Sequence, residues 1–204
     1  KRQNIYCGSS EPLVRETQVI ADDIHGETGL DGPVFMDERK AIEEEHAVSF
    51  IIRTLLENNE STTLVATGPL TNIALSLKLN PKIKNKIDEI VIMGGAFQHG
   101  NVTPAAEFNI YADPEAASIV FNSGLPIVMV GLDVTRQVLV KPEVMERMGK
   151  INNIASKLFV DLLIFFNKSQ NQVFGWEGGP LHDPLTIAYL IDPSVIQTLS
   201  LIHI

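Results

Sequence analysis

Apolar residues between positions 62 and 130 follow two alternating patterns. Short, continuous apolar runs are typical of buried strands, and they occur at Thr62–Ala66, Ile90–Met93 and Ile127–Val130. Helices are expected over Ile73–Leu79 and from Asp113, a capping residue type, to Gly124. Because strands and helices alternate, the pattern predicts an α/β fold with an open, mostly parallel sheet and helices on both faces.

The flanking segments predict loops and further helices. Residues 1–40 are rich in Gly, Pro, Asp and Glu, which indicates loops around one short edge element. Within residues 42–56, apolar side chains recur at three- and four-residue steps and predict a helix with one apolar face. Residues 144–166 and 184–191 are also expected to be mainly helical. We find no internal repeat or linker, and we expect one domain or a large part of one.

Composition excludes several classes of partner. The chain has 204 residues, 45% of them hydrophobic, and a formal net charge of -9 without any Lys/Arg cluster, which argues against nucleic-acid binding. No apolar run is long enough for a membrane span. The single Cys7 excludes an internal disulfide and a cysteine-based metal cluster, so a reducing, cytoplasmic location is expected.

The predicted strands all end in segments suited to ligand binding. Thr67-Gly68, Met93-Gly94 and Leu132-Asp133 follow the three strands in turn. In a parallel sheet these positions share one rim, and ligands bind outside the carboxyl ends of such strands. We therefore expect a site at this rim.

Polar side chains after the second strand predict a sugar site. The Gly94-Gly95 pair allows a sharp turn and close approach of a ligand. Glu107 and Asn109 are two residues apart, so in an extended segment they would point the same way while Phe108 points inward. With Asn101 they offer donors and acceptors to neighbouring hydroxyls. Taken alone, however, these residues could equally form a solvated loop.

A second signal is the segment from Gly178 to Pro184, which reads GGPLHDP. His182 could donate a proton near neutral pH, and it lies beside the Asp183 carboxylate at the start of an apolar helix. The simpler alternatives are that His182 hydrogen-bonds a loop and that Asp183 caps the helix.

Together these segments resemble the inosine-uridine preferring nucleoside hydrolases, especially their pyrimidine-preferring bacterial branch. The resemblance extends in unbroken order from Ile5 to about Pro193, and it includes IHGETGLDG from Ile24, ATGPLTN from Ala66 and the segment from Thr103 to Ala117. It implies an enzyme that cleaves the N-glycosidic bond of ribonucleosides, uridine or cytidine and possibly inosine, to ribose and free base. It also implies that the protein binds a nucleoside as its small-molecule substrate. The protein itself would form a homo-oligomer, either a dimer or a tetramer.

The resemblance also assigns roles to residues at the rim. Asn101, Glu107 and Asn109 would hold ribose hydroxyls, and Met93 and Phe108 would pack against the sugar, although either could be a core residue. The family uses a calcium ion, for which Asp183 and the Thr67 backbone carbonyl are expected ligands. Asp183 would also contact ribose.

On the base side, the resemblance points to residues from two further segments. His182 and His25 would be the two catalytic histidines that face the base. Gln170 and Phe174 would lie in the base-side lid of that branch. Phenylalanine stands at 174 where tyrosine is expected, so proton donation would depend more on the histidines. Trp176 either covers the site or packs in the core.

The chain departs from the family pattern at both ends. The amino-terminal Asp-x-Asp-Pro-Gly-x-Asp-Asp segment, expected to supply most calcium ligands and the aspartate that deprotonates water, is not in this sequence. The portion beyond about Ile191 is expected to be missing as well. We therefore interpret residues 1–204 as a partial nucleoside hydrolase domain. The alternative is a truncated, catalytically impaired module that binds ribosides or serves in assembly.

Overall fold

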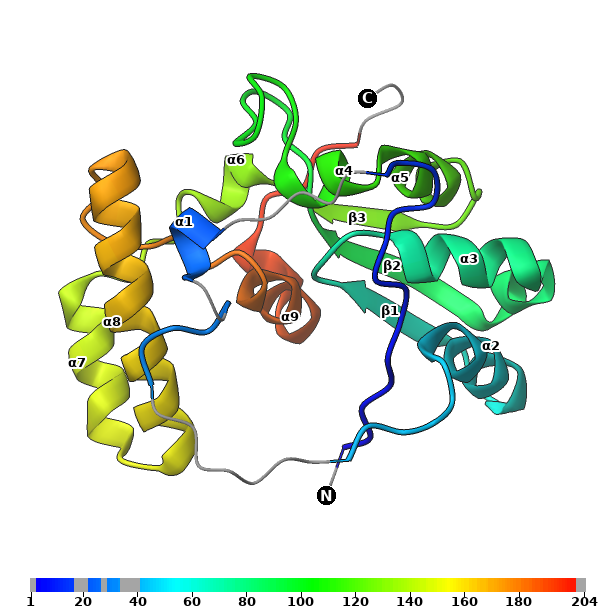
Figure 1. Cartoon of the computed structure of the whole chain (residues 1–204), viewed down its shortest axis with the longest axis horizontal. Helices are drawn as coiled ribbons and strands as arrows, with labels where there is room; N and C mark the ends of the chain where they lie inside the picture. The colour runs from blue at the N-terminus through cyan, green and yellow to red at the C-terminus, as the bar shows by residue number, and fades with distance from the viewer. Residues whose placement is uncertain (1–2, 17–21, 27–28, 34–40, 201–204) are drawn as a thin grey trace. The chain divides into compact units, whose positions relative to one another are not determined.

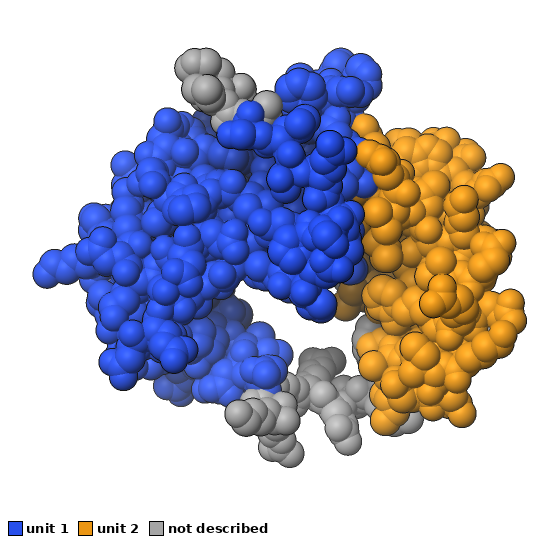
Figure 2. Space-filling view, turned by 180° about the vertical axis from the view of Figure 1, so that it is seen from behind, with its two compact units in different colours: residues 1–18, 40–134, 182–204 blue, residues 19–39, 135–181 orange. Residues whose placement is uncertain are grey.

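The computed structural model describes residues 3–16, 22–26, 29–33 and 41–200. The chain divides into two compact units, shown in different colours in Figure 2. Unit 1 consists of residues 1–18, 40–134 and 182–204, and unit 2 consists of residues 19–39 and 135–181. Among the described helices, none is long and apolar enough to cross a membrane.

Unit 1 is built on a parallel sheet of three strands in the order β1-β2-β3 (Figure 1). The strands are β1 (Thr62–Ala66), β2 (Ile87–Met93) and β3 (Ile127–Val130). The central strand is the most deeply buried, since Ile90, Val91 and Ile92 are fully inaccessible. Continuous apolar strands need cover on both faces, and the parallel α/β arrangement predicted from the pattern is confirmed.

Helices α2 (Ala47–Glu57), α3 (Thr71–Leu79) and α5 (Pro114–Phe121) pack with the sheet around one hydrophobic core. Shorter elements complete the unit: η1 (Pro81–Lys86), α4 (Phe108–Ala112), α6 (Leu132–Thr135), α9 (Pro184–Ile191) and η2 (Pro193–Val195). Asp113 caps α5 as predicted, because its Oδ1 accepts a hydrogen bond of 3.0 Å from the Ala116 amide. The carboxyl-terminal helix α9 contacts β2.

Helix α2 begins at Ala47, later than the pattern from residue 42 predicted. The preceding residues pair instead with the amino-terminal segment: the Glu43 amide donates to the Ile5 carbonyl at 2.9 Å, and the Ala47 amide donates to that of Cys7 at 2.8 Å. Tyr6 and Glu43 form an isolated parallel bridge, and the part of the chain described before residue 62 contains no named strand.

Unit 2 is helical, with α1 (Asp22–His25), α7 (Pro142–Ile151) and α8 (Ile154–Phe174). Both α1 and α7 pack against α8. The predicted helical region 144–166 is divided because Asn152 adopts a left-handed conformation, with φ of 52°, and Asn153 starts a new helix. Asn153 and Ser156 form a reciprocal capping box at that start.

Candidate functional site at the carboxyl ends of the strands

The rim predicted from the strand ends is present within unit 1. Ala66 pairs with Ile92, and Met93 pairs with Val130, so Thr67, the Gly94-Gly95 turn and Gly131 all follow at the same edge. Met93 is buried at the end of β2, whereas Thr67 is exposed. Gly95 requires its glycine, because φ is +78° and a Cβ would lie 2.7 Å from the Met129 sulfur.

Glu107 lies beneath this turn and is nearly inaccessible, with 3% of its surface exposed. One carboxylate oxygen, Oε2, accepts hydrogen bonds from the amides of Gly95 at 2.9 Å and Ile110 at 3.2 Å. Burial raises the pKa of Glu107, and the negative charge of Asp183 adds to the rise, while backbone amides including those of Gly95 and Ile110 oppose it. The site therefore holds a buried carboxylate that can accept a hydrogen bond from a donor group of a ligand.

The geometry expected for Glu107 and Asn109 is wrong. They do not lie on one side of an extended segment, because Glu107 is the N-cap of α4 and Asn109 lies inside that helix. The helical turn is favoured over an extended segment because the capping carboxylate accepts a hydrogen bond from a helix amide that would otherwise have no partner in the helix. Both side chains are nevertheless buried at the rim, and Phe108 between them is only partly buried.

Asn109 and Asn101 each use one half of the side-chain amide within the protein. Asn109 donates from Nδ2 to the Met93 carbonyl at 2.9 Å, so that bond does not occupy its Oδ1. Asn101 accepts a hydrogen bond of 2.8 Å at Oδ1 from the Phe108 amide. Its exposed side chain therefore presents Nδ2 as a donor. The cluster of Glu107, Asn109 and Asn101 thus combines acceptors with a donor, as recognition of a polyhydroxylated ligand requires.

Asp183 belongs to the same neighbourhood, although it is far along the chain from Glu107. Its charge contributes to the raised pKa of Glu107. Asp183 immediately precedes α9, yet its carboxylate makes no side-chain capping bond, so the simpler interpretation as a helix cap is not supported. His182 beside it is half-buried, and its carbonyl accepts a hydrogen bond of 3.3 Å from the Leu185 amide.

The expected metal ligands do not make a metal site by themselves. Asp183 and the Thr67 carbonyl are hard oxygen donors of the kind that calcium prefers, but calcium takes six to eight oxygen ligands. Within the described ranges, no three His, Cys, Asp or Glu residues lie together so that they could hold a metal ion. The described residues therefore do not fit a complete calcium site.

Of the base-side residues expected from the sequence, His182 lies in unit 1, and the others lie in unit 2. His25 is exposed and stacks on Phe166, with ring centroids 5.8 Å apart and planes at 8°. Gln170 is 4% exposed, and its Oε1 is the one buried side-chain polar atom among the described residues that has no hydrogen-bond partner. Phe174 stacks on Trp176 at 5.1 Å. Trp176 is half-buried. That His25, Gln170 and Phe174 lie on the base side of the site stays a prediction, and for Trp176 the two alternatives stay open.

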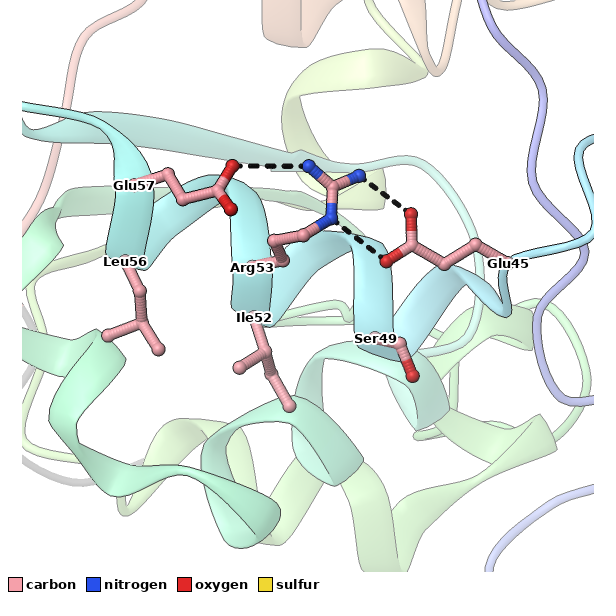
Figure 3. Close-up of a pocket in the computed structure, with 6 residues that line it drawn as sticks. All are labelled: Glu45, Ser49, Ile52, Arg53, Leu56 and Glu57. Atoms are coloured by element: carbon pink, nitrogen blue, oxygen red, sulfur yellow. Dashed lines mark hydrogen bonds and ion pairs between the residues drawn. The ribbon is translucent and has the colours of Figure 1, made fainter.

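Within unit 1, helix α2 carries a hollow on its surface (Figure 3). Figure 3 shows Arg53 bridged to carboxylates on either side, with nitrogen to oxygen distances of 2.7 Å to Glu45 and 3.2 Å to Glu57. The remaining lining residues are Ser49, Ile52 and Leu56. Because the guanidinium is already paired, this hollow lacks a free cation for an anionic ligand.

Comparison with known proteins identifies relatives over nearly the whole chain. The family model described as inosine-uridine preferring nucleoside hydrolase matches residues 1–204. The pyrimidine-specific ribonucleoside hydrolases RihB of Shigella flexneri and Escherichia coli are 50% identical over 194 residues. That alignment covers 95% of this chain and 62% of each relative. The chain thus spans less than two thirds of their length.

Comparison with solved structures also finds nucleoside hydrolases. A purine-preferring ribonucleoside hydrolase from Gardnerella vaginalis is 38% identical with a TM-score of 0.89, over 96% of this chain and 64% of that one. The plant nucleoside hydrolase PpNRh1 is 34% identical with a TM-score of 0.87, over 95% of this chain and 62% of that one. The fold is thus shared with a relative that is named purine-preferring.

Proposed function

Because the chain belongs to the inosine-uridine preferring nucleoside hydrolase family, we propose that it forms part of a ribonucleoside hydrolase. In the proposed reaction, water adds to the anomeric carbon as the bond to the base nitrogen breaks, and the base leaves with a proton. The products are ribose and the free base. The observation that carries this proposal is the buried, hydrogen-bonded Glu107 at the rim, with Asp183 near enough to affect its pKa.

Ribose recognition is assigned to the end of β2 and to α4. Glu107 and Asn109 would accept hydrogen bonds from ribose hydroxyls, and Asn101 would donate one through Nδ2. Met93 and Phe108 would contact the sugar's apolar face, and Asp183 would bind its hydroxyls. A site built to hydrogen-bond a hydroxyl discriminates strongly, since an analogue that lacks the group leaves a buried polar atom unpaired.

The base is proposed to be a pyrimidine, as in uridine or cytidine. The relatives that are 50% identical are named pyrimidine-specific, which supports this choice over inosine. The unpartnered Oε1 of Gln170 could accept a hydrogen bond from an amide or amino group on such a base. His182, with His25 as the second histidine, would protonate the leaving base, and Phe174 has no hydroxyl with which to do so.

Calcium is proposed as the cofactor of the full-length protein, with Asp183 and the Thr67 carbonyl as two of its ligands. Most of the remaining ligands would come from the amino-terminal Asp-rich segment typical of the family. We also propose that the full-length protein is cytoplasmic and that it forms a dimer or tetramer. Light scattering on the full-length protein would test the oligomeric state.

Release of ribose from uridine, cytidine and inosine by the full-length protein tests the proposed function. We expect hydrolysis of the pyrimidine nucleosides, faster than that of inosine. Absence of hydrolysis, together with measurable uridine binding in calorimetry, would favour the alternative of a riboside-binding module. Absence of both would favour an assembly role.

A further inference from the structure

Asp133, just beyond the end of β3, binds two consecutive backbone amides of the loop that follows β2. Its Oδ2 accepts a hydrogen bond of 2.6 Å from the Phe97 amide, and its Oδ1 accepts one of 3.0 Å from the Gln98 amide. A carboxylate that accepts from both amides at once fixes the direction of that backbone, because charge-assisted bonds are short and strong. With both oxygens occupied in this way, Asp133 is suited to holding the loop rather than to reacting with a ligand.

The same strand end holds the beginning of this loop through the backbone. The Leu132 amide donates to the Gly95 carbonyl at 2.9 Å. A Cβ on Gly131 would lie 2.9 Å from that carbonyl oxygen, so this close approach depends on glycine. Residues 131–133 therefore bind the loop after β2 at two successive places, first at Gly95 and then at Phe97 and Gln98.

Gly95 connects residues 131–133 directly to Glu107. Its carbonyl accepts from Leu132, while its amide donates to Glu107 Oε2 at 2.9 Å. A shift of the turn would therefore move the donor that orients the Glu107 carboxylate.

The far end of the loop is anchored to α4. The Asn101 amide donates to the Ala106 carbonyl at 3.0 Å, and Asn101 Oδ1 accepts from the Phe108 amide at 2.8 Å. The loop that carries Asn101 is thus held at its start by Leu132, in its middle by Asp133, and at its end by Ala106 and the first residue of α4.

We propose that Asp133 is a positioning residue that fixes the loop from Gly95 to Asn101 and thereby sets the placement of Asn101 and of the Glu107 carboxylate. This inference rests on the proposed function, because it assigns to these two residues the recognition of ribose. Displacement of a binding group by about 1 Å can reduce a rate on the order of a hundredfold.

The test uses the full-length protein with Asp133→Ala and Asp133→Asn, and Asp88→Ala as a control at an exposed aspartate on β2. For Asp133→Ala we expect kcat/KM for uridine to fall by roughly 10- to 100-fold, mainly through KM, because binding common to ground and transition states is weakened. Asp133→Asn keeps one acceptor and should recover part of the loss. Hydrogen exchange at Phe97 and Gln98 should accelerate in Asp133→Ala while β2 stays protected.

Faster exchange at Phe97 and Gln98 with unchanged kcat/KM, KM and uridine affinity would overturn the proposal. General loss of protection with normal activity per folded molecule would also overturn it, as would equal effects of the alanine and asparagine variants. If the wild-type protein hydrolyses no nucleoside, the proposed function fails, and uridine binding by calorimetry then decides the inference separately. Weaker binding in Asp133→Ala than in Asp88→Ala supports it, and equal binding refutes it.

Discussion

Glu107 combines a structural and a proposed binding role in one carboxylate. Oε2 is used by the protein, since it accepts the Gly95 and Ile110 amides and caps α4. Ribose recognition is therefore assigned to a side chain whose loss also affects the local fold. Variants at this position must separate hydrogen bonding from charge.

Glu107→Gln and Glu107→Ala in the full-length protein make that separation. Glutamine keeps one carbonyl oxygen that can accept from the two amides, whereas alanine removes the cap, at about 1 kcal/mol of unfolding free energy. We expect both variants to lose on the order of a hundredfold or more in kcat/KM for uridine, because ribose hydroxyls lose a charged partner. Kinetics and thermal melting are the measurements. A glutamine variant that melts at a much lower temperature yet keeps full activity per folded molecule would refute the binding role.

The buried environment of Glu107 also predicts a pH-dependent contribution to stability. Burial raises the pKa of Glu107 in the folded protein, so the folded state holds this proton to a higher pH than the unfolded state. Stability from this group is therefore full below the ordinary glutamate value of about 4.3 and falls as pH rises through the raised value. Urea unfolding of wild type and Glu107→Gln should give a difference that moves against wild type as pH rises. A difference independent of pH would contradict the assignment.

His182 is proposed to protonate the departing base, and substrates with different leaving groups test this. Uridine needs the proton more than a nitrophenyl riboside does, because nitrophenolate is already a stable anion. His182→Ala in the full-length protein should slow uridine hydrolysis by about 10²- to 10⁴-fold and affect the nitrophenyl substrate much less. Equal losses on both would assign His182 to positioning. A larger uridine-selective loss in His25→Ala would transfer the acid role to His25.

At the level of elements, Asp113 joins three parts of unit 1 that are distant in sequence. Its carboxylate caps α5, accepts a hydrogen bond of 2.6 Å from the Thr71 hydroxyl at the start of α3, and accepts one of 2.9 Å from the Leu13 amide. Its side chain is almost wholly buried. The amino-terminal segment is further held where the Ser9 amide donates to Asn72 Oδ1 at 2.9 Å.

Asp113→Ala in the full-length protein should therefore reduce the free energy of unfolding by roughly 3 kcal/mol, because three donors, two of them buried and one part-buried, lose their common acceptor. Thr71→Val is the matched control: it removes one of the three bonds with little change in shape, and about 1 kcal/mol is expected. Urea unfolding measures both. Equal losses in the two variants would show that Asp113 does not act as the common acceptor.

At the scale of the whole molecule, residues 1–204 are expected to bind calcium weakly. Asp183 and the Thr67 carbonyl leave most of calcium's six to eight positions unfilled. Calorimetry with calcium on the 204-residue chain should detect no tight site, whereas the full-length protein should bind. Micromolar binding by the 204-residue chain that disappears in Asp183→Ala would show that the further segment is dispensable.

Much of the fold followed from local sequence. The run from Thr62 to Ala66 and that from Ile127 to Val130 form strands with the predicted bounds, and α9 has the predicted range. These predictions succeeded because an apolar run or a capping residue acts over a few neighbouring positions. The start of α2 was missed because residues 43–47 bind the amino-terminal segment instead of continuing the helix. The division between α7 and α8 was missed because it depends on the left-handed backbone of Asn152.

The sequence by itself determined the parallel α/β pattern, the rim at the strand ends and the residues that resemble a ribose site. Only the tertiary structure decided that Glu107 binds the Gly95 amide, that the charge of Asp183 reaches it, and that Asp133 holds the loop after β2. The physical reason is range. Strand and helix preferences are set by adjacent residues, whereas burial, a shifted pKa and a carboxylate bound to a distant loop arise from segments that meet only when the chain folds.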